Sequence, residues 1–316
     1  MYTCADMNLA RSAGVDASGS DGDAFAIDLL RAFRPRQWVK NLLVFAALIF
    51  GQRLSHPASV VMSIYAFVVF CGLSSAVYLV NDVLDREADR HHPLKSRRPI
   101  ASGAIGAGAA LITSAVLTGA GLTAAFMMAP AFGLVAATYI LLMTLYSAAL
   151  KNHVILDTLA IAGGFVMRAL GGAVAIGVPF SHWLLIMTML LALFLALSKR
   201  RAELVDLPRN AIGHRRALAD YSPALLDQMI AIVTASTLLA YAFYTISPET
   251  VSKFGTDRLL LTLPFPLYGL FRYLYLIHHR AGGGNPSEQL FSDHPLLACV
   301  GLWGLTVIVI LYGPWR

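Results

Sequence analysis

Four oxygen-bearing side chains that directly follow an apolar segment have the spacing of a metal site. The segment is 59–80, and the side chains are Asn81, Asp82, Asp85 and Asp89. If a helix continues past the segment, the three aspartates, spaced i, i+3 and i+7, share one face with Asn81 at its edge. Carboxylates this close repel one another unless a cation or basic neighbours compensate them. Mg²⁺ prefers oxygen ligands and is usually bound together with substrate phosphates, so the spacing favours a metal–diphosphate site over a solvated helix end.

Basic side chains follow the acidic stretch. Lys95, Arg97 and Arg98 lie between Pro93 and Pro99, and the two prolines prevent a long helix and fix a bent connection. The three bases can therefore fold back towards the carboxylates. Acids for a metal ion and bases for phosphate oxygens are the groups that a site for a phosphorylated substrate needs. The alternative is that these bases only hold the loop beside anionic lipid.

Two further loops carry charged residues. Lys199 and Arg200 end an apolar segment, where they can point at an anionic group, or Lys199 can pair with Glu203 one helical turn away. In a shorter loop Lys151 is the sole base, and such a lysine often only extends its charged end towards water. Asp157 begins the next apolar segment and should face the interior of the bundle, because a carboxylate facing lipid is costly.

Arg168 is a charged residue well inside an apolar segment, between two Gly-Gly pairs at 163–164 and 171–172. An arginine within a membrane normally marks a polar cavity or a paired acid, and the glycines permit helices to approach closely. A purely structural ion pair with Asp157 is the alternative to a functional role.

The whole chain is 57% hydrophobic and 13% charged, with a mean hydropathy of +0.66. Soluble domains are about half apolar and about a quarter charged, so we predict an integral membrane protein with the lipid bilayer, and no nucleic acid, as its partner. A bilayer core about 30 Å thick needs about 20 apolar residues per helix. We expect an all-α, polytopic protein with a nine-helix transmembrane bundle within 31–316, after a disordered tail at 1–30. The nine spans are expected at about residues 40–55, 59–80, 104–127, 131–149, 154–178, 182–198, 225–246, 258–277 and 295–313.

The Lys and Arg residues predict how the bundle sits in the membrane. With these spans and a cytoplasmic N-terminus, 18 fall on the cytoplasmic side, four on the other side, and two, Arg168 and Arg272, inside spans. Positively charged loops remain in the cytoplasm. We therefore expect a protein of the bacterial cytoplasmic membrane, with its N-terminus inside, its C-terminus outside and the acidic stretch at the cytoplasmic face.

The acidic stretch resembles the Asn-Asp-x-x-Asp-x-x-x-Asp signature of the UbiA superfamily of membrane prenyltransferases. More specifically, four groups of residues resemble the decaprenyl-phosphate phosphoribosyltransferases of that superfamily. They are Arg34-Pro35-Arg36-Gln37-Trp38-Val39-Lys40-Asn41, His92-Pro93-x-Lys95-x-Arg97-Arg98-Pro99-Ile100-Ala101, Tyr146-Ser147 with Leu150-Lys151, and Lys199-Arg200-x-x-Glu203-Leu204. The resemblance covers about residues 31–313.

The resemblance implies a UbiA-type bundle that uses Mg²⁺ and two phosphorylated substrates. Aromatic prenyltransferases carry a second Asp-x-x-x-Asp motif for a prenyl diphosphate, whereas the matching loop here offers bases and Glu203. The implied substrates are phosphoribosyl pyrophosphate and a polyprenyl phosphate. The implied metal ligands are Asn81, Asp82, Asp85 and Asp89, and the implied catalytic residues are Asp82, Asp85 and Lys199. The residues implied to bind substrate phosphates are Lys40, Lys95, Arg97, Arg98, Tyr146, Lys151, Arg168 and Arg200.

Other functions stay open on the sequence. One is a prenyltransferase that moves a prenyl group from its diphosphate to an aromatic acceptor. Another is a transporter, which predicts charged groups near the middle of the bilayer. Only Arg168 fits that expectation, because most of the charged residues lie at one face of the bundle. If the chain is a phosphoribosyltransferase, its product can lead to arabinofuranose for cell-wall arabinan or for nodulation signals. The sequence decides neither this pathway, nor the prenyl chain length, nor whether the protein forms a homo-oligomer.

Overall fold

The computed structural model describes residues 17–91, 93–206, 218, 220–279 and 286–313. All regular elements in this part of the chain are helices, which confirms the predicted all-α fold. The α-helices are α1 (Ala17–Phe33), α2 (Ala46–Phe50), α3 (Pro57–Leu84), α4 (Arg86–Arg90), α5 (Pro99–Ser102), α6 (Ala107–Met128), α7 (Pro130–Ala148), α8 (Leu156–Ala175), α9 (His182–Asp206), α11 (Pro223–Ile246), α12 (Pro248–Phe254), α13 (Pro264–His279), α14 (Pro286–Ser292) and α15 (His294–Tyr312). The 3-10 helices are η1 (Pro35–Phe45), η2 (Lys95–Arg97), η3 (Leu150–Asn152) and η5 (Arg258–Thr262).

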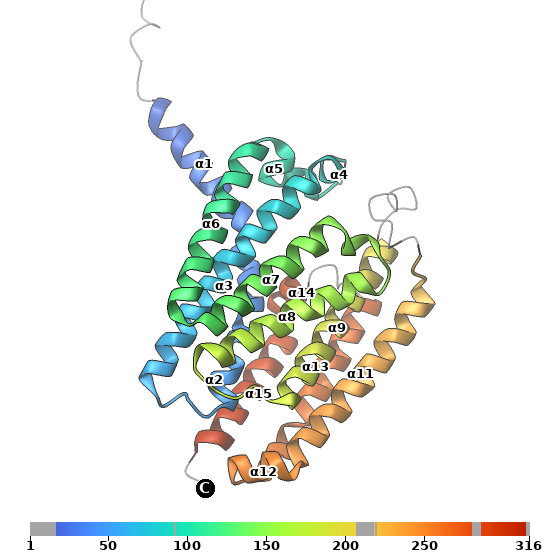
Figure 1. The fold of residues 1–316 in the computed structure, drawn as a ribbon. Helices are drawn as coiled ribbons and strands as arrows, with labels where there is room; N and C mark the ends of the chain where they lie inside the picture. Colours follow the sequence, from blue (N-terminus) through green and yellow to red (C-terminus); the bar gives the residue numbers. More distant parts are fainter. Residues whose placement is uncertain (1–16, 92, 207–217, 219, 280–285, 314–316) are drawn as a thin grey trace, which may run out of the picture.

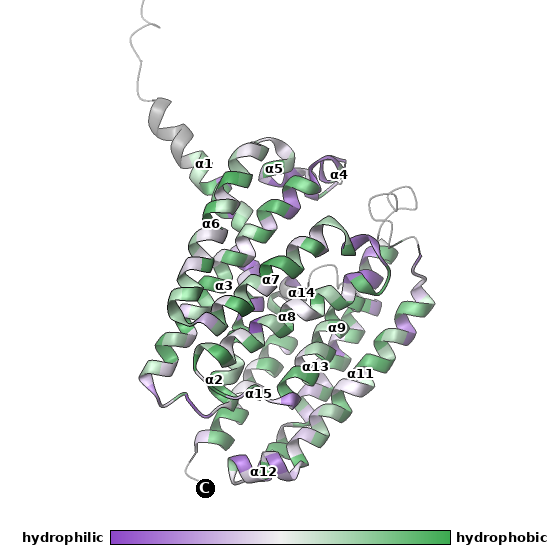
Figure 2. Ribbon diagram, in the orientation of Figure 1, coloured by the Kyte–Doolittle hydropathy of each residue, from purple (hydrophilic) through white to green (hydrophobic). Residues whose placement is uncertain are grey.

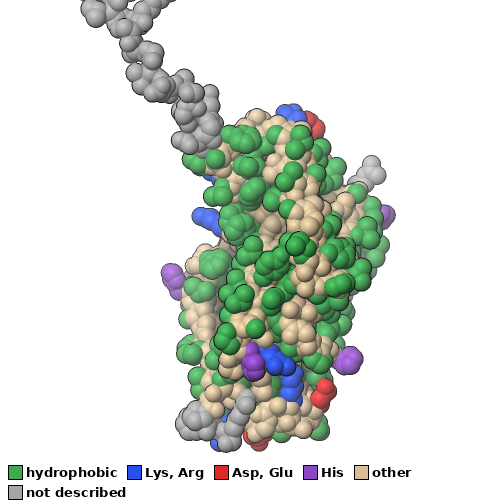
Figure 3. Space-filling view, turned by 60° about the vertical axis from the view of Figure 1, so that its left-hand side comes forward, with side chains coloured by type: hydrophobic (Ala, Val, Ile, Leu, Met, Phe, Trp, Pro, Cys, Tyr) green, Lys and Arg blue, Asp and Glu red, His purple; other side chains and the backbone are tan. Residues whose placement is uncertain are grey.

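The long helices form one bundle with two distinct ends (Figure 1). We call the end that carries α4 and α5 the acidic end, and the end that carries α2 and α12 the opposite end. Eight of the described helices are long and apolar enough to cross a membrane, and they correspond to the second to ninth predicted spans. Hydrophobic side chains cover most of the face visible in Figure 3. The chain is therefore an integral membrane protein.

The first predicted span, 40–55, is not a single α-helix. The chain there forms the eleven residues of η1 and the five of α2, which pack against α3 and α8. Because a 3-10 helix rises about 2.0 Å per residue, these two short elements together extend about 30 Å. At the far end of the segment the hydroxyl of Tyr312 donates to the carbonyl oxygens of Leu48 and Ile49, at 3.2 and 3.0 Å. The segment thus passes along the bundle from the acidic end to the opposite end in extended helical form.

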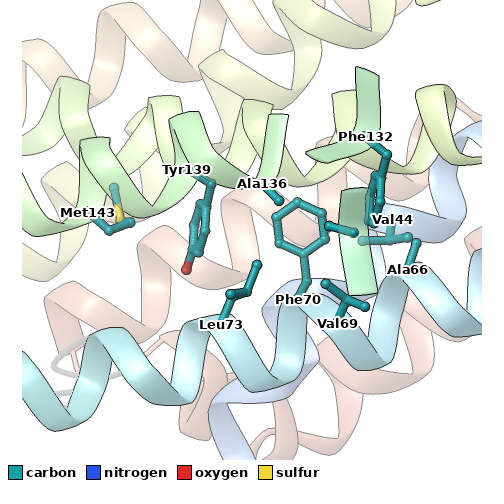
Figure 4. Close-up of a cluster of buried hydrophobic side chains, with 10 residues drawn as sticks. Val44, Ala66, Val69, Phe70, Leu73, Phe132, Ala136, Tyr139 and Met143 are labelled. Carbon is teal, nitrogen blue, oxygen red and sulfur yellow. The ribbon is translucent and has the colours of Figure 1, made fainter. Parts of the chain in front are cut away.

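The core around this segment requires a close approach of two backbones. A Cβ placed on Gly172 of α8 would lie 2.0 Å from the carbonyl oxygen of Val44 in η1, so only glycine lets η1 and α8 touch here. Around Val44 the rings of Phe70, Phe132 and Tyr139 pack edge to face, with centroids 5.9 and 5.4 Å from Phe70 (Figure 4). This packing fixes η1 relative to α3 and α7.

The second part of the tail that the sequence predicted to be disordered, residues 1–30, forms helix α1. Ala32 and Phe33 at its end pack against Leu79 and Ile100 of the bundle. Burial of this apolar end stabilises a helix that composition alone does not indicate. The first part of the tail lies outside the described residues.

Candidate functional site

The acidic stretch lies where α3 meets α4, and α4 is among the hydrophilic segments coloured purple in Figure 2. Helix α3 ends at Leu84, and Asp85, with φ −91° and ψ 2°, joins it to α4. The Asp85 amide donates to the Asn81 carbonyl at 2.9 Å and the Asp89 amide to the Asp85 carbonyl at 2.8 Å. Both bonds join residues four apart, as in an α-helix, so the helical hydrogen bonding continues from α3 through Asp85 into α4. The predicted continuation of the helix is therefore confirmed, with one irregular residue.

Two of the three aspartates share one arginine. Asp82 and Asp89 are 2% and 4% exposed, and Nη1 of Arg98 donates to both, at 3.2 and 2.5 Å. Asp82 also accepts a hydrogen bond from Arg34. Burial raises the pKa of the Asp89 carboxyl, and the charge of Arg98 opposes this shift. Two buried carboxylates are thus balanced by two guanidinium groups.

The third aspartate, Asp85, is more open and faces a different part of the chain. Its Oδ1 accepts from Nζ of Lys151 at 2.6 Å, and its Oδ2 accepts from the Asn81 amide at 3.0 Å. Lys151 lies in η3, between α7 and α8, and its side chain is 14% exposed. The lone loop lysine therefore reaches inwards to the acidic stretch and does not extend into water.

Arg34 contacts the acidic stretch although it was absent from the predicted site. Its backbone is left-handed, with φ 55° and ψ 60°, and Pro35 follows. A residue before proline avoids the right-handed helical region, so the chain turns here and the side chain reaches Asp82. The guanidinium also lies 5.2 Å from the centre of the Tyr78 ring. Its place before Pro35, in the same group of residues as Lys40, is the signal that could have identified it.

The oxygen donors of the acidic stretch suit Mg²⁺ in combination with a phosphate. Within the described ranges, no group of three or more His, Cys, Asp or Glu side chains is placed to enclose a metal. Mg²⁺ is usually held through one or two carboxylates plus substrate phosphates, so a complete protein cage is not needed. Asp82 and Asp85, with the amide oxygen of Asn81, provide such a donor set.

Three other residues expected to bind phosphate are not among the side chains that the described structure shows bonded to the acidic stretch. Lys95 lies in η2 and its charge acts on Asp89. Arg97 is exposed and makes no hydrogen bond or ion pair with another residue that the structure describes. Lys40 in η1 is half-buried, close to the charge of Arg168, and it too has no such bond among the described residues. Arg97 and Lys40 are thus two predicted site residues without a bonded partner within the described part of the chain.

Arg200 is the centre of a second, buried cluster. Its guanidinium donates to Oδ2 of Asp157 at 2.6 Å, to Glu203, and to the Tyr146 hydroxyl at 3.3 Å. Asp157 is 0% exposed, so its predicted inward orientation is confirmed. Nζ of Lys199 lies 3.8 Å from Glu203, the pair predicted one helical turn apart. Every side-chain nitrogen of Arg200 has a protein partner in this arrangement.

Arg168 has only neutral partners in the described part of the chain. It donates to Oδ1 of Asn41 at 2.7 Å, to the Gly164 carbonyl at 2.8 Å and to the Tyr139 hydroxyl at 2.8 Å. The alternative of an ion pair with Asp157 is wrong, because Asp157 is occupied in the second cluster. Arg168 instead anchors η1 to α8 through Asn41.

The predicted site residues lie at different distances from the acidic end of the bundle. Asn41 also donates to Ser74 of α3 at 3.2 Å, and Ser74 precedes Asp82 by eight residues, or about 12 Å of helix rise. Arg168 therefore lies well below the aspartates. The residues brought together at the acidic stretch are Asn81, Asp82, Asp85, Asp89, Arg98 and Lys151, and those in the second cluster are Tyr146, Lys199 and Arg200.

Comparisons with known proteins identify the family and the fold. Residues 42–291 match the UbiA prenyltransferase family. The chain is 32% identical over 297 residues to the decaprenyl-phosphate phosphoribosyltransferase of Corynebacterium glutamicum, a match that covers 90% of this chain and 86% of the relative. It is 29% identical over 195 residues to the nodulation protein NoeC of Azorhizobium caulinodans, covering 60% of this chain and 63% of that protein. A UbiA homolog from Archaeoglobus fulgidus bound to GPP and Mg²⁺ has the same fold, with a TM-score of 0.67 and 18% identity over 89% of this chain and 99% of the homolog.

Proposed function

The chain belongs to the UbiA prenyltransferase family, and we propose that it is a membrane phosphoribosyltransferase. It transfers 5-phosphoribose from phosphoribosyl pyrophosphate to a polyprenyl phosphate of the decaprenyl type and releases pyrophosphate. The similarity to the Corynebacterium glutamicum enzyme supports this substrate pair, since it extends over 90% of the chain. The solved homolog bound to GPP and Mg²⁺ supports the fold alone.

The observation that carries the proposal is the balance of charge at the acidic stretch. Each of its three aspartates accepts a hydrogen bond from a basic side chain, and the bases come from three separate segments of the chain. They are Arg34, Arg98 and Lys151. When a diphosphate enters with Mg²⁺, the aspartates can pass to the metal and the bases to the phosphate oxygens without a change in total protein charge. Such an exchange needs only one group of aspartates, so the lack of a second Asp-x-x-x-Asp motif does not argue against it.

The reaction replaces one C–O bond at the anomeric carbon by another. Bound Mg²⁺ would neutralise charge on the departing pyrophosphate. Asp82 and Asp85 would hold the metal, with Asn81 and Asp89 in support, and the neighbouring bases would orient the pyrophosphate. The anomeric carbon gains oxocarbenium character as its bond to pyrophosphate breaks. The attacking oxygen belongs to a phosphate monoester, whose second pKa is about 6, so it is already ionised and needs no strong general base.

The acceptor phosphate approaches from the lipid side of the same end. Lys199 is the candidate to orient it, because it lies in the second cluster and its side chain is 38% exposed. The apolar flanks of the bundle accommodate the polyprenyl chain. From the distribution of Lys and Arg we propose that the acidic end faces the cytoplasm. The product is a lipid-linked phosphoribose, a precursor of lipid-linked arabinofuranose for cell-wall arabinan or nodulation signals, and the likeness to NoeC favours neither exclusively.

A direct assay tests the proposal. Purified protein in micelles with decaprenyl phosphate and ribose-labelled phosphoribosyl pyrophosphate should form a labelled lipid when Mg²⁺ is present. The same protein with geranyl diphosphate and an aromatic acceptor should form no prenylated product. A prenylated aromatic product without any labelled lipid would overturn the proposal and favour the aromatic prenyltransferase.

A further inference from the structure

The connection between α7 and α8 holds Lys151 with a strained backbone. Ile155, the last residue before α8, has φ 69° and ψ −47°. A β-branched side chain rarely adopts a positive φ, because its branches collide with the backbone, and such a conformation persists only when surrounding contacts impose it. The contacts that impose it therefore determine where this connection, and the lysine on it, can lie.

One contact on Ile155 comes from a different loop. The hydroxyl of Tyr221, two residues before α11, accepts a hydrogen bond from the Ile155 amide at 2.7 Å. The same hydroxyl donates to Oδ1 of Asp157 at 3.1 Å. Tyr221 is 5% exposed, and burial raises the pKa of its hydroxyl. The group thus stays neutral, and its single proton is committed to Asp157 while a lone pair holds Ile155.

Asp157 is itself immobilised, which gives Tyr221 a fixed anchor. The other carboxylate oxygen of Asp157 accepts from the buried Arg200 at 2.6 Å. Tyr221 therefore links a rigid ion pair between α8 and α9 to the strained residue beside it. Removing the hydroxyl would leave the Ile155 amide and one Asp157 oxygen without these partners.

Two backbone hydrogen bonds tie Asp157, at the start of α8, to the turn that carries Lys151. The His153 amide donates to the Leu150 carbonyl at 3.1 Å, and the Asp157 amide donates to the His153 carbonyl at 3.0 Å. Only three residues separate Ile155 from Lys151, so a shift of Ile155 would also shift the backbone of Lys151. Lys151 ends this path with its 2.6 Å contact to Asp85.

We infer that Tyr221 is a positioning residue of the phosphoribosyltransferase site: by holding the Ile155 amide against the fixed carboxylate of Asp157, it places Lys151 at Asp85. This inference rests on the proposed function, in which Lys151 passes from Asp85 to a phosphate oxygen of the donor. Tyr221 touches no reacting atom and acts only through the α7–α8 connection.

The variant Tyr221→Phe keeps the ring and removes only the hydroxyl. We expect kcat/KM for phosphoribosyl pyrophosphate to fall about 10-fold to 100-fold, as for other residues that orient a binding group, with most of the change in KM. In a Lys151→Ala background the same substitution should change kcat/KM less than about 2-fold, because two residues on one path are not additive. Equal losses in both backgrounds, or no loss in either, would overturn the inference.

A matched control separates positioning from general loss of stability. Tyr241 is also buried, at 6% exposed, and its hydroxyl bonds to Thr262 at 2.5 Å and accepts from Trp303 at 2.9 Å. It lies far from Lys151 in the described structure, among the aromatic residues near α12. Tyr241→Phe should lower the melting temperature about as much as Tyr221→Phe and leave KM unchanged. A matching rise of KM in Tyr241→Phe would show that KM reports stability, which also overturns the inference.

Amide hydrogen exchange tests the contact without any assay of the reaction. In Tyr221→Phe the peptide that covers residues 149–157 should exchange faster than in the wild-type protein, while peptides from α15 should not change. Unchanged exchange at 149–157 overturns the inference even if the enzyme is active. Faster exchange in a protein that makes no lipid-linked phosphoribose would remove the proposed function and leave the structural role of Tyr221 in place.

Discussion

Arg200 and Asp157 form an ion pair of 2.6 Å in which the two side chains are only 1% and 0% exposed. The pair joins α9 to the first turn of α8, next to the connection that carries Lys151. A charge in this interior is tolerated only while its partner is present, since the energy of removing it from water is otherwise not recovered. This pair therefore ties the stability of the bundle to the geometry of the site.

Replacement of Arg200 by methionine should destabilise the protein strongly. Arg200→Met keeps the length of the side chain but leaves Asp157 charged and buried, which costs about 3–5 kcal/mol. Thermal unfolding in detergent measures the effect. Arg31 is the control, because it pairs with Asp28 while 71% exposed, and Arg31→Met should leave the melting temperature unchanged. Equal melting temperatures for the two variants would contradict the structural importance of the buried pair.

Asp82→Asn should remove turnover while the protein stays folded. The amide fills the same volume but is a poor metal ligand, so transfer should fall at least about 100-fold, given the several kcal/mol that a metal contributes to such reactions. The control is Asp227→Asn, whose carboxylate pairs with Arg201 outside the acidic stretch. Transfer assays at saturating Mg²⁺ compare the two. Full activity in Asp82→Asn would end the metal assignment.

Removal of divalent cations should stop the reaction reversibly. Without the metal the three aspartates keep their present basic partners. The negative charge that develops on the departing pyrophosphate is then not neutralised, so its bond to ribose does not break at a measurable rate. Activity should vanish with excess EDTA and return when Mg²⁺ is added above the chelator concentration. The melting temperature without substrate should hardly change, because the basic side chains already balance the carboxylates. Undiminished transfer in EDTA would argue for a metal-independent mechanism.

Gly172→Ala should disrupt the contact between α8 and η1. The added Cβ would lie 2.0 Å from the Val44 carbonyl oxygen, and backbones forced apart in a packed core typically cost about 1–3 kcal/mol. Gly119→Ala is the matched control, because a Cβ there meets no atom within 4 Å and alanine favours the helix. Thermal unfolding should show a lower melting temperature for the first variant and no loss for the second. A stable Gly172→Ala would mean that η1 can shift away from α8.

Local spacing accounts for what was predicted correctly. Long apolar runs indicate the α-helical spans whatever their neighbours are, because lipid requires backbone groups to be satisfied within each helix. The pattern from Asn81 to Asp89 likewise places its side chains together through the period of the helix. The role of these side chains as metal ligands is still a prediction. The first crossing was predicted less well, since η1 rises more per residue than an α-helix and contains fewer residues than a normal span.

The sequence by itself determined the membrane-spanning class, the family and the place of the acidic stretch, because these depend on composition and on residues within a few turns of one another. Only the tertiary structure decided which base meets which acid. Arg34 lies 48 residues from Asp82, and Lys151 lies 66 residues from Asp85. Such pairs form when helices distant in the chain pack side by side, and no local periodicity specifies that packing. For the same reason the hydrogen bond from the Ile155 amide to Tyr221, 66 residues away, could be recognised only from the fold.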